Sequence, residues 1–268
     1  MGNAMMRMDD ALSRGARESH HGLVRLMADV LFPRGCAGCA APGWVLCPRC
    51  EDGFGRPMAR EVSRGWVGSG QVWCSGLYSG SVRNAILRWK DHHDEEVDAP
   101  LARAMRVLAC AMAAHMPRRG PLLVVPVPSS PASARRRGRR QTHVLADAVA
   151  HGLARAGVEA RMAPVLRMGV SDKAVSSGHA RDRAARVRGR IGIARPWDDA
   201  IASMGIRAAV LVDDIVTTGA TMGGCASALR AAGFDVPAAF ALACAPGEGV
   251  AAMDGDDQSS RAAASVVS

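Results

Sequence analysis

Residues 210–221, Val-Leu-Val-Asp-Asp-Ile-Val-Thr-Thr-Gly-Ala-Thr, constrain the fold more than any other part of the chain. The stretch begins with an apolar, β-branched run, which is typical of a buried parallel strand. Asp213 and Asp214 follow that run, and a small polar turn comes next. Beyond the turn, small and apolar residues recur at helical spacing until Gly233, a common helix stop. The stretch therefore predicts a strand–turn–helix unit of an α/β protein.

The turn has the composition of a phosphate-binding loop. Ligands of open α/β sheets bind at the carboxyl ends of strands, and the N–H groups that open a helix favour anions. Gly219 leaves room beside the backbone, because it lacks a Cβ atom, and Ala220 belongs to the same turn. The hydroxyls of Thr217, Thr218 and Thr221 can donate to phosphate oxygens. The acidic pair before the turn can accept hydrogen bonds from sugar hydroxyls. We expect a sugar-phosphate site here; the alternative is an ordinary strand–turn–helix with solvated acids.

Four cysteines near the N-terminus form two Cys-x-x-Cys pairs, Cys36 with Cys39 and Cys47 with Cys50, separated by seven residues. Four thiolates complete the tetrahedral shell of a structural Zn²⁺ ion, and the glycines and prolines between them suit tight turns. The sequence therefore predicts a zinc-binding module. An iron–sulfur cluster and four unrelated buried cysteines are the alternatives.

A second apolar run, residues 122–128, predicts another core strand, and Ser129 follows it. The segment Arg135–Gln141 then places five arginines in seven positions. Arginine forks bind phosphate oxygens in pairs, so this segment can form a phosphate-seeking loop after a core strand. The alternative is an arginine-rich surface without a ligand.

The positive net charge of the chain is weak evidence for a nucleic-acid partner. The net charge of +9 would fit a nucleic-acid partner, but only two of the 34 basic residues are lysine, which indicates a coding bias as much as a function. No signal-peptide core and no apolar run of about 18 residues is present. We therefore expect a cytoplasmic protein without membrane insertion, whose cysteines are reduced or metal-bound.

Taken in order, these motifs resemble the ComF/ComFC (GntX-like) family over roughly residues 22–246. The resemblance rests on Leu31-Phe32-Pro33 before the cysteines, Tyr78-Ser79-Gly80 with Lys90, Val125-Pro126-Val127-Pro128, Arg137-Gly138 with Gln141, and residues 212–221. The last of these resembles the 5-phosphoribosyl 1-pyrophosphate (PRPP) motif of type I phosphoribosyltransferases. Arg139 and Arg140 stand where the family usually has Phe and Asn.

The resemblance implies a type I phosphoribosyltransferase-like α/β fold, a mostly parallel sheet flanked by helices, with a small N-terminal zinc-binding module. It implies Mg²⁺-bound PRPP as ligand, with the ribose hydroxyls on Asp213 and Asp214 and the 5′-phosphate on the Thr217–Thr221 turn. Ser129, Arg137 and Gln141 are the further substrate-binding residues that it suggests. Separately, the polar, basic and Gly/Ser-containing composition of residues 171–190 predicts a mobile loop that could close over a substrate; the alternative is a disordered segment without function.

We expect a disordered segment over 1–21, the zinc-binding module with a leading helix over 22–60, the phosphoribosyltransferase-like domain over 70–246 and a disordered tail over 247–268. Two functions remain open. The first is a phosphoribosyltransferase with an unidentified acceptor, linked to DNA uptake in competence; Thr217, where purine-salvage relatives often have Asp, argues against that branch. The second is a non-catalytic adaptor that binds PRPP or a nucleotide and contacts single-stranded DNA, a competence helicase or another DNA-processing partner.

Overall fold

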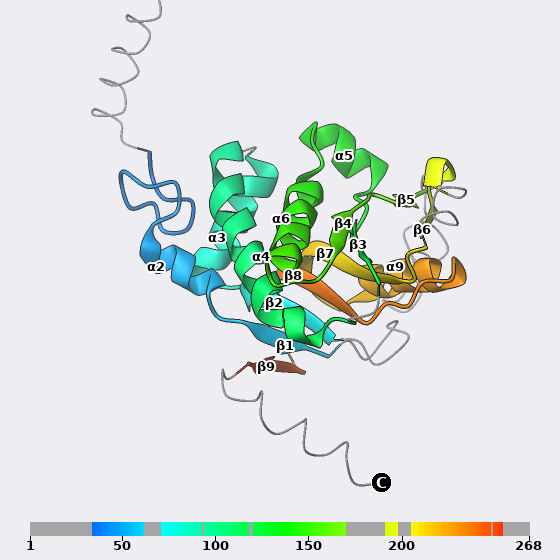
Figure 1. Cartoon of the computed structure of the whole chain (residues 1–268). Helices are drawn as coiled ribbons and strands as arrows, with labels where there is room; N and C mark the ends of the chain where they lie inside the picture. The colour runs from blue at the N-terminus through cyan, green and yellow to red at the C-terminus, as the bar shows by residue number, and fades with distance from the viewer. Residues whose placement is uncertain are drawn as a thin grey trace, which may run out of the picture.

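The computed structural model describes residues 34–61, 71–92, 94–117, 120–169, 191–197, 205–247 and 249–253. Its centre is a seven-stranded sheet of order β4-β3-β7-β8-β2-β1-β9 (Figure 1). The strands are β1 Met58–Arg60, β2 Gln71–Leu77, β3 Leu122–Pro126, β4 Ala160–Met162, β7 Ala208–Val216, β8 Ala238–Cys244 and β9 Val250–Ala252. The five strands from β4 to β2 run parallel to one another, and β1 runs antiparallel to both of its neighbours, β2 and β9. The mostly parallel α/β sheet that the sequence predicts is therefore confirmed.

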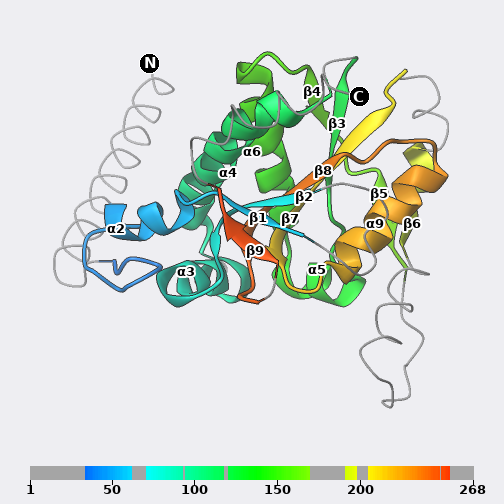
Figure 2. The ribbon, with the colours of Figure 1, turned by 90° about the horizontal axis from the view of Figure 1, so that it is seen from below.

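Helices cover both faces of the sheet (Figures 1 and 2). One face carries α3 Gly80–Asp91, α4 Asp98–Met112 and α6 Gln141–Arg155, and the other carries α9 Ala220–Ala231. A small antiparallel sheet of β5 Leu166–Met168 and β6 Ile191–Ile193 joins the α9 side. Each face therefore has its own hydrophobic core, and side chains of the central strands alternate between the two.

The alternation is clearest in β7 and β8. Val210 and Val212 of β7 lie in the core with α4 and α6, whereas Ala209 and Leu211 lie in the core with α9. All residues of β8 are buried, as expected for a parallel strand covered on both faces. The edge of the sheet at which these strands end is consequently the place where a polar side chain can reach solvent.

Within the described ranges, five short helical segments connect the larger elements: α2 Pro48–Glu51, η1 Asp52–Phe54, η2 Glu95–Val97, η3 Ala113–His115 and η4 Arg195–Trp197. A sixth, α5 Pro131–Arg137, corrects the expected arginine loop, because three of its arginines form the last turn of this helix. The Ser130 hydroxyl accepts from the Ser133 N–H at 3.2 Å at the start of α5, and Gly138 ends the helix with φ of 66°. Local capping therefore decides this segment.

The cysteine segment packs directly on the α/β core. Cys50 and Phe54 lie in the same hydrophobic cluster as Ile86 of α3 and Leu101 of α4. Strand β1 falls within the range expected for the zinc-binding module, and β9 falls within the range expected for the tail. The division into domains stays a prediction. The structure shows that the cysteine segment and the α/β domain share one hydrophobic core. None of the helices in the described ranges is long and apolar enough to cross a membrane.

Candidate functional site

The four cysteines form one cluster. Their Sγ atoms all lie within 4.8 Å of one another, and Cys39 and Cys47 are 3.6 Å apart. Tight turns make this possible: the Cys36 N–H donates to the Ala41 carbonyl at 2.8 Å, and Ala40 adopts a φ of 62°. Among the residues that the structure describes, no other cluster could hold a metal ion.

The geometry of this cluster fits a tetrahedral ion. Zn–S bonds of about 2.3 Å place the sulfur atoms roughly 3.8 Å apart, close to the separations found here. Burial alone would raise the pKa of Cys36, but the N–H groups of Cys47, Cys39 and Gly38 outweigh it and lower that pKa to about 6. The four cysteines are thus positioned to bind a metal ion, and they are compatible with structural zinc.

The acidic pair lies near the carboxyl end of β7, within the central parallel strands. Because consecutive side chains of a strand alternate, Asp213 and Asp214 point to opposite faces of the sheet. The Asp214 side faces α3, where the Lys90 Nζ atom lies 2.8 Å from its Oδ2 atom. On the other side, the Asp213 charge contributes to raising the pKa of the Cys225 thiol in α9, second to burial. The two carboxylates therefore have different environments.

The two acids differ in burial and in partner. Asp214 is only 7% exposed, and the partly buried Lys90 pairs with it on the same side of the sheet. Burial, and second the neighbouring Asp214 charge, raise the pKa of Asp213 to about 8. The Asp214 N–H, which donates to Asp213 Oδ1 at 2.8 Å, partly offsets that rise. The surroundings of Asp213 therefore favour its protonated form, whereas the Asp214 carboxylate has a cationic partner in Lys90.

The turn after β7 forms a small hollow of about 40 Å³. Its walls include all five residues of the predicted turn, Thr217–Thr221, together with Asp213. Gly219 has a φ of 71° and opens α9, so the N–H groups of the first turn of α9 lie beside the hollow. The Thr218 hydroxyl accepts from the Ala220 N–H at 3.4 Å. Size and donors together suit a phosphate group.

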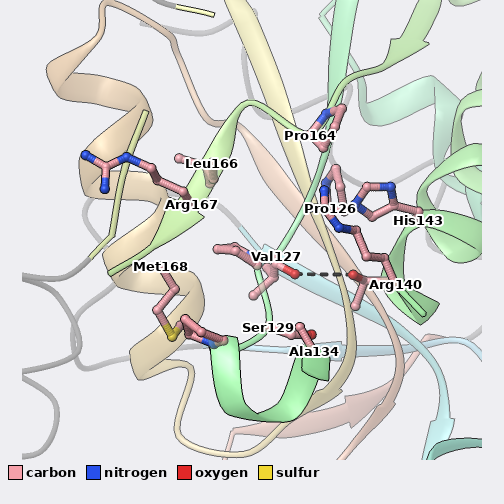
Figure 3. Close-up of a pocket in the computed structure, with 13 residues that line it drawn as sticks. Pro126, Val127, Ser129, Ala134, Arg140, His143, Pro164, Leu166, Arg167 and Met168 are labelled. Atoms are coloured by element: carbon pink, nitrogen blue, oxygen red, sulfur yellow. Dashed lines mark hydrogen bonds between the residues drawn. The ribbon is translucent and has the colours of Figure 1, made fainter. Parts of the chain in front are cut away.

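A larger cavity of about 260 Å³ lies beyond the end of β3 (Figure 3). Ser129 lines it, and its charged lining side chains are Arg140 and Arg167. His143, also in the wall, has a lowered pKa, first through burial and then through the Arg140 charge. No carboxylate is among the lining residues, so the described wall of this cavity favours anions.

Of the two predicted substrate-binding residues near α5, Arg137 lies near the acidic pair, whereas Gln141 contacts α3. Arg137 is half-buried, and its charge lowers the pKa of Asp213, which places it near the acidic pair. Gln141 is 3% exposed and donates from Nε2 to the Trp89 carbonyl at 2.6 Å. Its role in binding a substrate stays a prediction, whereas its contact with α3 is structural. The expected loop over 171–190 lies outside the described residues.

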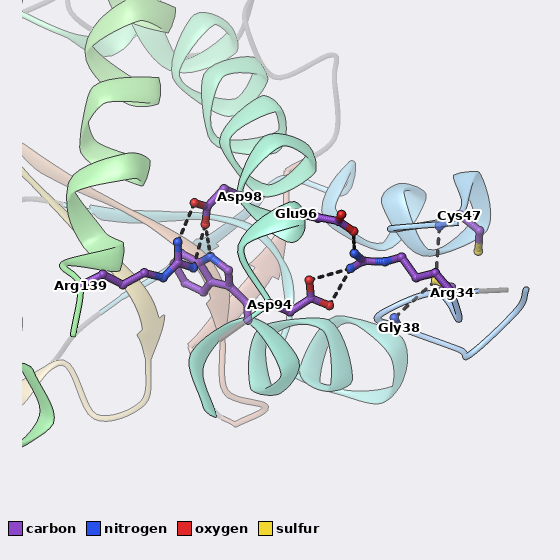
Figure 4. A network of polar contacts seen from close by, with 9 residues as sticks. Arg34, Gly38, Cys47, Asp94, Glu96, Asp98 and Arg139 are labelled. Atoms are coloured by element: carbon purple, nitrogen blue, oxygen red, sulfur yellow. Dashed lines mark hydrogen bonds and ion pairs between the residues drawn. The ribbon is translucent and has the colours of Figure 1, made fainter. Parts of the chain in front are cut away.

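Arg139, which stands where the resemblance leads one to expect Phe, has a structural partner. Its Nη1 and Nη2 atoms bind the two carboxylate oxygens of Asp98 at 2.7 and 3.0 Å, and the guanidinium lies 5.9 Å from the Trp89 ring centroid (Figure 4). This contact ties the start of α6 to α3 and α4. Arg139 therefore packs against the Trp89 ring, and it is not among the residues that line the hollow after β7.

Sequence spacing does not reveal the Lys90–Asp214 pair, because the two residues lie far apart in the chain. Lys90 stands only among the residues that carry the family resemblance, and the sequence predicts no role for it. One signal was present: it is one of two lysines in a chain that otherwise uses arginine. A compact ammonium fits beside a buried carboxylate where a guanidinium needs more room.

Neither the protein-family models nor the curated proteins with which the sequence was compared gave a match.

Proposed function

We propose that the protein binds PRPP at the carboxyl end of β7. One observation carries this proposal: an acidic pair lies near the carboxyl end of a central parallel strand, beside a hollow lined by threonines and the first turn of α9. A sugar phosphate needs hydroxyl acceptors and phosphate donors side by side, and this edge of the sheet supplies both. The resemblance of residues 212–221 to the PRPP motif supports the same ligand.

In this proposal the 5′-phosphate occupies the hollow at Thr217–Thr221, and the ribose hydroxyls donate to the acidic pair. The pyrophosphate lies toward α5, where Arg137 is near Asp213. Mg²⁺ enters with the pyrophosphate, whose oxygens it prefers. Ser129 lines the neighbouring cavity and lies within reach of the same end of the sheet.

The reaction proposed is phosphoribosyl transfer. The bond between the anomeric carbon and the pyrophosphate oxygen breaks, and its electron pair leaves with pyrophosphate. A nitrogen of the acceptor forms the new bond to that carbon with its lone pair, and the proton of that nitrogen passes to solvent water. Arg137 and the nearby arginines would stabilise the charge that develops on the leaving group, an electrostatic contribution. The ComF-like order of motifs supports a place for this activity in the handling of incoming DNA.

A second candidate is a non-catalytic adaptor that holds PRPP or a nucleotide as a ligand. The observation that favours it is the composition of the turn: Thr217–Thr221 offers hydroxyls and backbone but no side chain that would take a proton. Arg135, Arg136 and Arg140 are exposed on and just after α5, where they could contact the phosphates of single-stranded DNA.

We also propose that the resident ion of the cysteine cluster is a structural Zn²⁺. Four thiolates leave no open coordination position, so the ion would order the turns of the segment without taking part in chemistry. Its consequences for stability are set out in the Discussion.

Calorimetric titration with Mg²⁺·PRPP and with ribose 5-phosphate tests the ligand. We expect PRPP to bind more tightly, because ribose 5-phosphate lacks the pyrophosphate. Absence of binding by both ligands would reject the proposal. Release of pyrophosphate in the presence of a panel of amines and bases then separates the enzyme from the adaptor, which binds PRPP without consuming it. For the adaptor, affinity for single-stranded DNA should fall steeply with salt.

A further inference from the structure

Helix α3 contacts the cysteine cluster near its first turns. The Asn84 side-chain amide donates to the Gly38 carbonyl, between the first pair of cysteines, at 3.1 Å. A Cβ atom added at Gly38 would lie 2.7 Å from the Cys50 sulfur and 3.1 Å from the Ser81 Cβ atom. Gly38 is therefore enclosed between a cysteine of the cluster and α3, and no larger residue fits there without displacing one of them.

A second contact reaches the chain just after α3. The Arg34 guanidinium, two residues before Cys36, binds both carboxylate oxygens of Asp94 at 2.7 and 2.6 Å and also pairs with Glu96 (Figure 4). Arg34 and Asp94 are both partly buried, so this pair is better shielded from solvent than an ordinary surface pair. The cysteine segment is thus attached to both ends of α3.

The last turn of α3 contacts the acidic edge. Lys90 pairs with Asp214 at 2.8 Å, and the Trp89 carbonyl accepts from Gln141 at 2.6 Å. Between the two ends, Ile86 and Trp89 are fully buried, so the helix is held on the core along its length. A displacement at its first turns therefore reaches Lys90 as a shift of the whole helix.

We propose that α3 couples metal occupancy of the cysteine cluster to ligand affinity at the acidic edge, with Asn84 and Lys90 as positioning residues at its two ends. This inference rests on the proposed zinc and the proposed PRPP. In this proposal the bound ion fixes the positions of the Gly38 carbonyl and of Arg34. These two contacts hold α3 in place, and α3 in turn places the Lys90 ammonium beside Asp214. Without the ion the turns that carry Gly38 and Arg34 loosen, and Lys90 no longer holds Asp214 in one position.

Coupling between two sites is reciprocal, so the ligand must strengthen metal retention by the factor by which the metal strengthens ligand binding. We expect a factor of about five to ten, near the lower end of usual coupling, because the apolar face of α3 keeps the helix on the sheet in either state. A purely structural zinc would show no such factor.

The first experiment measures zinc release from the full-length holoprotein into a chromogenic chelator, with and without saturating Mg²⁺·PRPP. We expect PRPP to slow release about five- to tenfold in the natural chain. Asn84→Ala should abolish most of this protection. Arg103→Ala is the matched control, because it removes the 3.4 Å pair between Arg103 of α4 and Glu51 next to Cys50, a contact that does not pass through α3.

Arg103→Ala should keep the protection by PRPP. Equal release rates with and without bound PRPP in the natural chain would overturn the coupling while leaving the proposed ligand intact. Equal protection in Asn84→Ala and in the natural chain would overturn the role of α3.

A second experiment tests the coupling without any ligand, so that failure of PRPP to bind does not leave it undecided. Amide hydrogen exchange of the holoprotein and of Asn84→Ala should differ over residues 80–91 and near Asp214, with faster exchange in the variant. Protection over β3 should not change. If exchange over 80–91 is the same in both proteins and also after zinc removal, α3 does not transmit the state of the metal site.

Discussion

The cysteine cluster and the acidic edge are built in opposite ways. All four cysteines come from one stretch of the chain, residues 36–50, and turns of the backbone alone bring them together. The acidic edge gathers Asp214 from β7, Lys90 from α3 and Arg137 from α5, which meet only when the sheet and its helices assemble. A site of the first kind can be found from spacing, whereas a site of the second kind needs the fold.

The two regions also differ in how they balance charge. The cysteine cluster places four thiol sulfurs within 4.8 Å of one another, an arrangement positioned to bind a metal ion and compatible with structural zinc. The acidic edge already has partners within the protein, since Lys90 pairs with Asp214 at 2.8 Å and burial raises the pKa of Asp213 to about 8. A ligand there must replace existing contacts, so its affinity depends on the protonation of the edge.

The largest effect should follow loss of a cysteine. The purified protein should carry about one zinc ion per chain, and Cys39→Ser should remove it and lower the melting temperature by about 10 °C, because metal binding supplies folding free energy. Metal analysis and calorimetry measure the two effects. The matched control is Cys110→Ser, an exposed lone cysteine of α4, which should keep both the metal and the melting temperature. A metal-free natural protein after careful reduction would remove the basis of the comparison.

The acidic edge should respond mainly in ligand affinity. Asp213→Asn/Asp214→Asn removes the charge with the shape kept, and we expect Mg²⁺·PRPP to bind about ten- to a hundredfold more weakly, as loss of ~1.4–2.8 kcal/mol would give. Titration calorimetry measures the change. Asp147→Asn, on an exposed position of α6, is the control and should bind normally. An unchanged affinity in the double variant would mean that the edge does not hold the ribose.

A smaller effect should separate Arg137 from its neighbours. Arg137→Ala should weaken PRPP about fivefold and ribose 5-phosphate less, because only PRPP carries the pyrophosphate that a guanidinium near Asp213 can reach. Arg136→Ala, the exposed neighbour on α5, supplies the control for a general loss of positive charge. Equal weakening by both variants and for both ligands would indicate that the basic segment acts through its overall field.

The smallest expected effect is a shift of a few degrees with pH. The pKa of Asp213 rises from 3.8 to about 8 on folding, so the folded chain holds a proton that the unfolded chain releases. The free energy of unfolding therefore falls as the pH rises from about 4 to about 8, because folding holds the Asp213 proton and the rising pH removes it. Asp213→Asn should melt a few degrees above the natural protein at pH 8.5, and by less at pH 6.5. The opposite order at pH 8.5 would show that folding does not raise the pKa of Asp213.

Long periodic segments were predictable because their own residues decide them. The apolar run of β7, the buried run of β3 and the helical spacing of α6 each specify one element. The three-residue strands β1, β4 and β9 carry no such pattern, since they form only by pairing with a neighbour. The helix α5 was missed because the arginines of its last turn suggested a loop, whereas Ser130 and Gly138 cap a helix.

The candidate site was predictable to a similar extent. Asp213, Asp214 and the threonine turn lie in one stretch, and the spacing of the cysteines gave the metal cluster directly. The divergence of the two carboxylates follows from strand alternation and could have been foreseen. The Lys90–Asp214 pair and the contact of Arg139 with Asp98 depend on the packing of α3, α4 and α6, which no local pattern encodes.

Strand β9 has a consequence for solubility. It pairs antiparallel with β1, and the Met253 N–H donates to the Pro57 carbonyl at 3.1 Å beyond the last pair. Strand β1 thereby has neighbours on both sides, and the open edge passes to a strand of three residues. Unpaired backbone groups on a strand are a template for another chain. Removal of residues 249–253 would move the open edge inward to β1 and favour aggregation through that strand, with the two sites of the molecule still in place.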